Sequence, residues 1–259
     1  MLSFAGFIPT SPILIPTIGR EHLEKLHKTT DAIKKLGEGL TASNPSAVLL
    51  ISYPEKISES YILNVASPYQ GNFEPFGDFG TKITRPFDAV LGHQLKEALD
   101  KKFPLVSENY GLPYTVSTPL ALLSSALKDI PVVSLSVSSL PLSNHFELGK
   151  TLREELLKNS KRIAVLATGD LSHRLTPDSP AGFSPRAEEF DHTVMTLLQS
   201  KSSSGITQLP SDILLEVQEQ GTKTLSVMLG VLEAMNYDPE ILSYEGPLGI
   251  GHTVINFNI

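Results

Sequence analysis

Cysteine is absent from this chain of 259 residues. Its absence excludes disulfide bonds, cysteine nucleophiles, and zinc or iron–sulfur sites that are built from thiolates. Long apolar runs are absent too, because none approaches the ~20 residues that a membrane-spanning helix requires. Pro9, Pro12 and Pro16 interrupt the apolar N-terminus and no basic residue precedes it, so we do not expect a signal peptide. We expect a cytoplasmic protein with no membrane partner.

Positive charge is scarce relative to negative charge. The chain carries 21 Lys and Arg against 28 Asp and Glu, a formal net charge of −7. No Lys/Arg cluster is long enough to follow a phosphate backbone, so we expect no nucleic-acid partner. The remaining composition, 41% hydrophobic and 19% charged, is typical of a globular protein. A chain of this length can bury one large core, and we expect a single domain over residues 1–259.

Short apolar runs alternate with segments in which Leu and Ile recur at helical spacing. The runs predict strands at 3–8, 47–52, 61–66, 130–137, 163–167, 241–244 and 252–257, and the helical spacing predicts helices at 21–40, 87–99, 118–127, 144–158, 188–198 and 213–235. Pro119 is typical of a first helical turn, Asn144 of an N-cap, and Gly221 of an interruption. Segments 69–80 and 201–205 are predicted as loops. The alternation indicates the α/β class, with a mostly parallel central sheet flanked by helices.

Polar side chains follow the strand predicted at 163–167. Asp170, Ser172, His173 and Arg174 come where that strand ends, and ligand sites of open α/β sheets form at this edge. His173 is a candidate general acid–base group because the pKa of histidine lies near neutrality, and Asp170 is a candidate catalytic partner. Arg174 is a candidate anchor for a substrate carboxylate. Each also has a structural interpretation, as a backbone-bonded histidine, an Asx turn or a surface charge.

The sequence of this segment is similar to that of a known family. GDLSH at 169–173, followed by a Pro/Gly loop and EFD at 189–191, resembles the class III extradiol ring-cleavage dioxygenases, specifically their catalytic B subunit, and the related Memo-like proteins. Further similar segments occur in family order, namely FIPTSPILIP at 7–16, LLISYPE at 49–55, LPYTVSTPLALL at 112–123 and YEGPLGIGHTVINF at 244–257. The resemblance implies the family's single α/β domain and Fe(II)-dependent opening of catechol rings. It assigns His173 as the acid–base histidine and Glu189 as the iron-binding carboxylate.

The iron-binding histidines of that family are replaced here. Thr10 stands where the resemblance places the first, and Pro54, or Tyr53 if the turn is shifted by one, stands where it places the second. Tyr114 stands where an additional active-site histidine is usual. A non-haem Fe(II) oxygenase needs two histidines and one carboxylate. Because proline offers no side-chain ligand and threonine only a neutral hydroxyl, we expect a degenerate metal site with altered or lost dioxygenase activity.

Two residues, His252 and Glu189, are candidate metal ligands. His252 follows a glycine-rich turn where relatives often carry tyrosine, and it would restore one imidazole to the cleft; the alternative is a packed interior histidine. Glu189 begins a helix, so it is also interpretable as an acid that complements the helix dipole. His192 lies three residues beyond Glu189 on the same helix face.

Three functional hypotheses stay open. The first is an Fe(II) ring-cleaving dioxygenase with unrecognised replacement ligands. The second is a binding or scaffold protein that holds a small aromatic or polar ligand through Arg174, Ser172, Thr10 and Tyr114, without redox chemistry. The third is a metal-independent acid–base or hydrolytic enzyme that uses His173. The resemblance also implies a homodimer or a small partner subunit.

Overall fold

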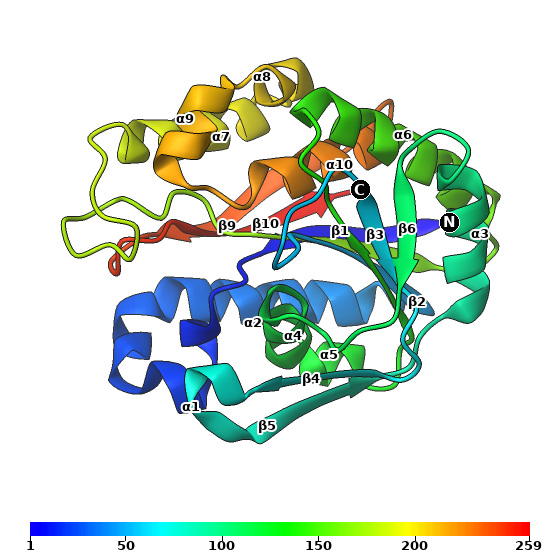
Figure 1. The fold of residues 1–259 in the computed structure, drawn as a ribbon, viewed down its shortest axis with the longest axis horizontal. Helices are drawn as coiled ribbons and strands as arrows, with labels where there is room; N and C mark the ends of the chain where they lie inside the picture. The colour runs from blue at the N-terminus through cyan, green and yellow to red at the C-terminus, as the bar shows by residue number, and fades with distance from the viewer.

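The computed structural model describes residues 1–259 and contains an eight-stranded sheet in the order β6-β3-β7-β2-β8-β1-β10-β9 (Figure 1). The strands are β1 (Leu2–Ile8), β2 (Ala47–Ser52), β3 (Tyr61–Asn64), β6 (Leu105–Glu108), β7 (Val132–Ser136), β8 (Ile163–Thr168), β9 (Asp238–Glu245) and β10 (His252–Asn258). The four central strands β7, β2, β8 and β1 are parallel. β10 pairs antiparallel with β1 and with β9, and β3 pairs antiparallel with β7. The predicted mostly parallel sheet is therefore confirmed.

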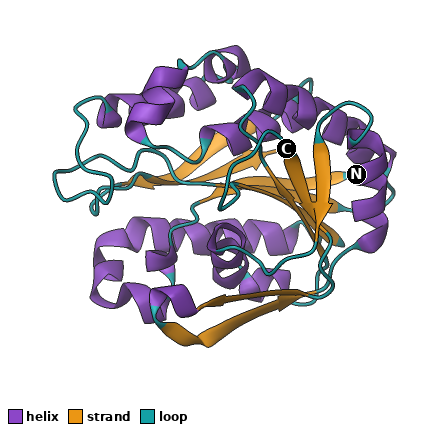
Figure 2. Ribbon diagram, in the orientation of Figure 1, coloured by secondary structure: helices purple, strands orange, loops and turns teal.

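Helices cover both faces of this sheet, as Figure 2 shows. They are α1 (Pro16–Gly19), α2 (His27–Ala42), α3 (Ala89–Leu99), α4 (Tyr114–Leu122), α5 (Ser124–Leu127), α6 (Leu142–Lys158), α7 (Ala187–Gln199), α8 (Ser203–Thr207), α9 (Ser211–Val217) and α10 (Thr222–Leu232). In Figure 1, α2, α4 and α5 lie below the sheet and α6 to α10 lie above it. Because both faces are covered, β2 and β8 are buried at every position, which explains why they read as continuous apolar runs.

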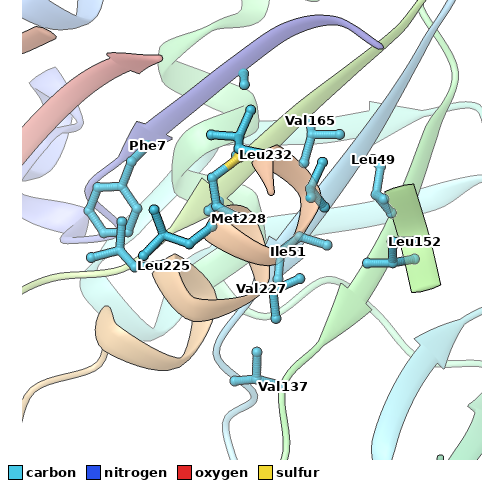
Figure 3. Packing of buried hydrophobic residues seen from close by; sticks show 14 of the residues in the cluster. Phe7, Leu49, Ile51, Val137, Leu152, Val165, Leu225, Val227, Met228 and Leu232 are labelled. Atoms are coloured by element: carbon cyan, nitrogen blue, oxygen red, sulfur yellow. The ribbon is translucent and has the colours of Figure 1, made fainter. Parts of the chain in front are cut away.

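The upper layer packs through α10. Leu225 and Met228 of this helix lie beside Phe7 of β1, and Val227 lies near Ile51 of β2 (Figure 3). On its other side α10 meets α6 at two glycines, because an added Cβ on Gly149 would lie 2.1 Å from the carbonyl oxygen of Val227. The start of α10 is fixed above the carboxyl end of β8, because the hydroxyl of Thr224 donates to the carbonyl oxygen of Thr168 at 2.9 Å.

A hairpin replaces the loop predicted at 69–80. β4 (Tyr69–Phe73) pairs antiparallel with β5 (Asp78–Arg85) outside α4, and a short 3₁₀ turn, Glu74–Phe76, joins them. Tyr69 anchors the hairpin: its buried hydroxyl donates to the carbonyl oxygen of Asn64 at 2.6 Å and accepts from the amide of Ser134 at 3.1 Å. The prediction was wrong because only Pro75 and Gly77 belong to the turn, whereas Gly71 and Gly80 lie within the two strands.

Several local predictions also need correction. Pro119 lies inside α4 and not in a first turn, and the carbonyl of Thr115 accepts instead from the hydroxyl of Thr168 at 3.3 Å. α6 begins directly after Pro141, so Asn144 is not its cap. The predicted loop 201–205 contains the start of α8. By contrast, the predicted interruption at Gly221 is confirmed between α9 and α10.

None of the helices is both long and apolar enough to span a bilayer.

Candidate functional site

The candidate site begins where two neighbouring parallel strands end. Ile8 of β1 pairs with Thr168 of β8, so Thr10 and Asp170 come two residues beyond the same register position. The amide and hydroxyl of Thr10 donate to the two oxygens of the Asp170 carboxylate at 3.2 Å and 2.6 Å. Both residues are buried. The predicted ligand position Thr10 and the predicted catalytic Asp170 are thus joined to each other, although 160 residues separate them.

His252 lies beside this pair at the start of β10. Its Nε2 is 3.8 Å from Oδ1 of Asp170, which is beyond hydrogen-bonding distance. Neither ring nitrogen has a hydrogen-bond partner, and the side chain is fully buried. Burial lowers the pKa of His252, and the charge of Asp170 opposes that shift. Burial thus favours the neutral imidazole, whose one N–H donor and one acceptor nitrogen are both without a partner.

The turn that carries His173 is held by backbone hydrogen bonds. The amide of His173 donates to the carbonyl of Val217 at 2.9 Å, and Leu171 and Ser172 exchange bonds of 2.8 Å with Gly251. Nδ1 of His173 lies 3.1 Å from the carbonyl oxygen of Leu171. Because a carbonyl only accepts, Nδ1 is the donor in this contact, and in the neutral imidazole Nε2 is then an acceptor. His173 is half-buried, so a ligand has access to it.

Ser172 and Arg174 stabilise this turn. The Ser172 hydroxyl accepts from the amide of Arg174 at 3.1 Å. The guanidinium of Arg174 donates to the carbonyl oxygens of Glu216 at 2.9 Å and Phe183 at 3.2 Å. These bonds tie the Pro/Gly loop to α9. Both residues thus have a structural role, and their predicted contact with substrate stays a prediction.

A buried carboxylate that the sequence analysis did not select supports the same turn. Asp191 of α7 accepts from the amide of Ser172 at 2.9 Å and from the hydroxyl of Tyr244 at 2.9 Å. Burial raises its pKa to about 7, although both hydrogen bonds oppose the shift. Gly251 lies against it, because an added Cβ there would be 2.1 Å from Oδ2 of Asp191. In the sequence, Asp191 resembles the other acids of a helix start, so only its apolar neighbours hinted at burial.

Glu219 is a second buried carboxylate that the sequence analysis did not select. It accepts from the amides of Gly221 and Thr222 at 2.8 Å and 2.7 Å, and from the Thr222 hydroxyl at 2.6 Å. It therefore caps α10. The next amide, that of Gln220, donates to the carbonyl oxygen of Asp170 at 3.0 Å. The available signal was an acid two residues before the glycine that interrupts the predicted helix.

Glu189 and Tyr114 lie at different depths. We refer to Thr10, Asp170 and His252 as the Asp170 cluster. Glu189 is exposed on α7, where it lines a surface hollow with Glu188 and His192, and its side chain makes no hydrogen bond to the Asp170 cluster. The resemblance placed it at the iron, whereas the structure turns it to the surface. Tyr114 is half-buried at the start of α4, with its ring 5.5 Å edge-to-face from Phe76. Burial raises the pKa of Tyr114, and Asp170 adds to the shift.

The residues around Asp170 do not fit an iron site. The Asp170 carboxylate already accepts two bonds from Thr10, the Glu219 carboxylate accepts three from the start of α10, and Pro54 has no donor atom. No group of three or more His, Cys, Asp or Glu side chains is close enough to hold a metal ion. In this arrangement no two histidines and a carboxylate lie close enough together to form the facial site of a non-haem iron oxygenase.

Comparisons with known proteins agree with the fold. The chain is 25% identical over 268 residues to Protein CA_C1420 of Clostridium acetobutylicum, covering 98% of this chain and 57% of that protein. It is 27% identical to the 2-aminophenol 1,6-dioxygenase beta subunit of a Pseudomonas species, over 51% of this chain and 49% of that subunit. The matches thus span about half the length of each of these curated relatives.

A solved structure has the same fold. The crystal structure of the uncharacterized protein JW3007 from Escherichia coli K12 superimposes with a TM-score of 0.65 at 20% identity, over 97% of this chain and 98% of that one. A family profile matches residues 5–255, nearly the whole chain. The chain therefore belongs to the LigB family, whose description is the catalytic LigB subunit of aromatic ring-opening dioxygenase.

Proposed function

We propose that this chain is a LigB-family protein that binds a small aromatic or polar ligand and has lost iron-dependent ring cleavage. One observation carries the proposal. Thr10, at the position that the resemblance assigns to the first iron-binding histidine, donates both its amide and its hydroxyl to Asp170. Thr10 therefore offers a neutral hydroxyl oxygen in place of an imidazole, and such an oxygen is a poor ligand for divalent iron.

The ligand class follows from the relative and from the residues at the cleft. The 2-aminophenol 1,6-dioxygenase beta subunit is named for an aromatic substrate with adjacent amino and hydroxyl groups. Tyr53 and Tyr114 are half-buried beside the Asp170 cluster and offer aromatic faces to such a ring. We propose Tyr114, Asp170 and His173 as the ligand-facing residues. A small partner subunit or a second copy of the chain remains part of the proposal.

A ring-cleavage assay tests the loss of activity. Purified protein is loaded anaerobically with Fe(II) and then mixed with catechol or 2-aminophenol in air, while oxygen uptake and the absorbance of the ring-opened product are followed. We expect no turnover above that of free Fe(II). Iron-dependent turnover that disappears in a Glu219→Gln or His252→Ala variant would overturn the proposal.

A second function, acid–base catalysis without a metal, is favoured by the tautomer of His173. Its Nδ1 donates to the carbonyl of Leu171, so Nε2 is free to accept a proton from a bound ligand. Nuclear magnetic resonance can follow the exchange of an acidic ligand proton with deuterated water. We expect the rate of this exchange to depend on His173. If the His173→Gln variant exchanges that proton as fast as the unmodified protein, His173 is not a base.

A further inference from the structure

A groove lies next to the Asp170 cluster, outside the carboxyl end of β2. It consists of two hollows of about 470 and 250 Å³ that share Glu55 and Gly111; we refer to it as the Glu55 groove. The larger hollow contains Pro54, Glu108 and Tyr110, and the smaller contains Phe76 and Tyr114. Ligands of open α/β sheets bind outside the carboxyl ends of strands, and Glu55 comes three residues after β2.

The walls of the Glu55 groove combine aromatic rings with free carboxylates. Tyr110, Tyr114 and Phe76 contribute the rings, and Phe76 and Tyr114 pack edge-to-face at 5.5 Å. Neither Glu55 nor Glu108 takes part in any ion pair of the chain. Ring faces and unpaired carboxylates are the two groups that attract an organic cation.

The negative charge extends over the aromatic walls. The pKa of Tyr110 is raised by burial first, and Glu108 and Glu55 add to the shift. The pKa of Tyr114 is raised by burial, then by Asp170 and Glu55. Three carboxylates thus act on the two rings, whereas Lys56 is the one cation among the lining residues and is exposed.

The cations near the cluster are already bonded elsewhere. The guanidinium of Arg174 holds two carbonyl oxygens, and the ammonium of Lys223 donates to the carbonyl of Leu140 at 2.6 Å. The exposed Lys56 is then the one counter-charge that an anionic ligand would meet beside Asp170 and Glu55. Tyr114 lines the groove and also lies within the field of Asp170, so it connects the groove to the buried cluster.

We propose that the Glu55 groove binds a primary amine that carries an aromatic ring on a short alkyl chain, in its ammonium form, with the ring between Phe76, Tyr110 and Tyr114 and the ammonium group at Glu55. This inference names the ligand class of the proposed function and rests on it. The groove thereby discriminates by charge, since an ammonium group gains Coulombic attraction and a carboxylate of the same shape meets repulsion.

Isothermal titration calorimetry of the metal-free chain tests the proposal with three probes of similar shape, 2-phenylethylammonium, 2-phenylethanol and 3-phenylpropanoate. We expect the ammonium compound to bind about tenfold more tightly than the alcohol, and the carboxylate to bind most weakly. Glu55→Gln should weaken ammonium binding about fivefold. Glu59→Gln, a matched loss of charge at a nearby residue outside the lining, should leave it unchanged.

A second variant tests the contribution of the Tyr114 ring to binding separately from that of the Glu55 charge. Tyr114→Leu keeps an apolar side chain but removes the aromatic face, so we expect it to weaken the ammonium compound and the alcohol together. The proposal is overturned if the ammonium compound does not bind, if the three probes bind equally, or if Glu55→Gln and Glu59→Gln have the same effect. Ring cleavage by the iron-loaded protein would overturn the proposed function alone, because these titrations contain no metal.

Discussion

The buried carboxylate of Asp191 makes the stability of the protein depend on pH near neutrality. Its side chain is fully buried, and its partners are the Ser172 amide and the Tyr244 hydroxyl. Glu188 and Glu219 face it with like charge. Replacing Asp191 by Asn keeps an oxygen that accepts from Ser172 and removes the ionisation. The predicted result is a protein whose stability changes less with pH.

The magnitude follows from the pKa of Asp191, which burial raises from 3.8 to about 7. Because the folded protein binds this proton more tightly than the unfolded chain, its stabilising contribution is complete below pH 3.8 and is lost as the pH rises to 7. Each pH unit inside that window changes the free energy of unfolding by about 1.4 kcal/mol. Lowering the pH from 7 to 5 should therefore stabilise the protein through this group by about 2 kcal/mol.

Urea denaturation followed by circular dichroism at pH 5, 6, 7 and 8 measures this effect. For the unmodified chain we expect a gain in unfolding free energy on going from pH 7 to pH 5. This gain should be about 2 kcal/mol larger than the gain for Asp191→Asn. Glu189→Gln, an exposed acid on the same helix, is the control and should follow the unmodified chain. The reasoning is refuted if Asp191→Asn shows the same pH dependence as the unmodified chain.

Three further substitutions test the structural contacts of the cluster by urea denaturation. Gly251→Ala places a Cβ 2.1 Å from Oδ2 of Asp191 and should cost about 1–3 kcal/mol; an unchanged midpoint would contradict this close packing. Arg174→Ala leaves the carbonyls of Glu216 and Phe183 without their donor and should cost about 1–3 kcal/mol while leaving 2-phenylethylammonium binding intact; lost binding at unchanged stability would restore Arg174 as a ligand contact. Glu219→Ala removes the cap of α10 and should cost about 1–2 kcal/mol, so an unaltered stability would show that the cap is dispensable.

The sheet was predictable from the sequence wherever strands are buried on both faces. β2 and β8 read as continuous apolar runs because helices cover them above and below. β6 lies at an edge and is mostly exposed, so it carries no such run and was missed. In the β4–β5 hairpin the burial of Tyr69 and Phe73 outweighs the turn signals of Gly71, Pro75 and Gly77. Tertiary contacts determine whether these segments form strands, and such contacts cannot be read from the local sequence.

The position of Asp170 and His173 at the edge of the sheet was predictable, but the hydrogen bonds between the residues there were not. Residues after β8 were expected at a ligand edge, and Asp170 and His173 lie there. The bond from Thr10 to Asp170 depends on the register of β1 beside β8, which no motif specifies. Asp191 was overlooked because an acid in a first helical turn is usually explained by the helix dipole. Only the fold reveals that this carboxylate is buried and points at Ser172.

The most direct test of the loss of iron-dependent chemistry is the iron content of the protein. Elemental analysis measures the iron bound to the protein purified without chelator. The same measurement is made after anaerobic loading with Fe(II) and desalting, and on an Asp170→Asn variant treated in the same way. We expect less than about a tenth of an equivalent of iron in each sample, because no set of three ligands is close enough to hold the ion. Near-stoichiometric iron that is lost in Asp170→Asn would contradict the proposal and show that these residues rearrange into a metal site.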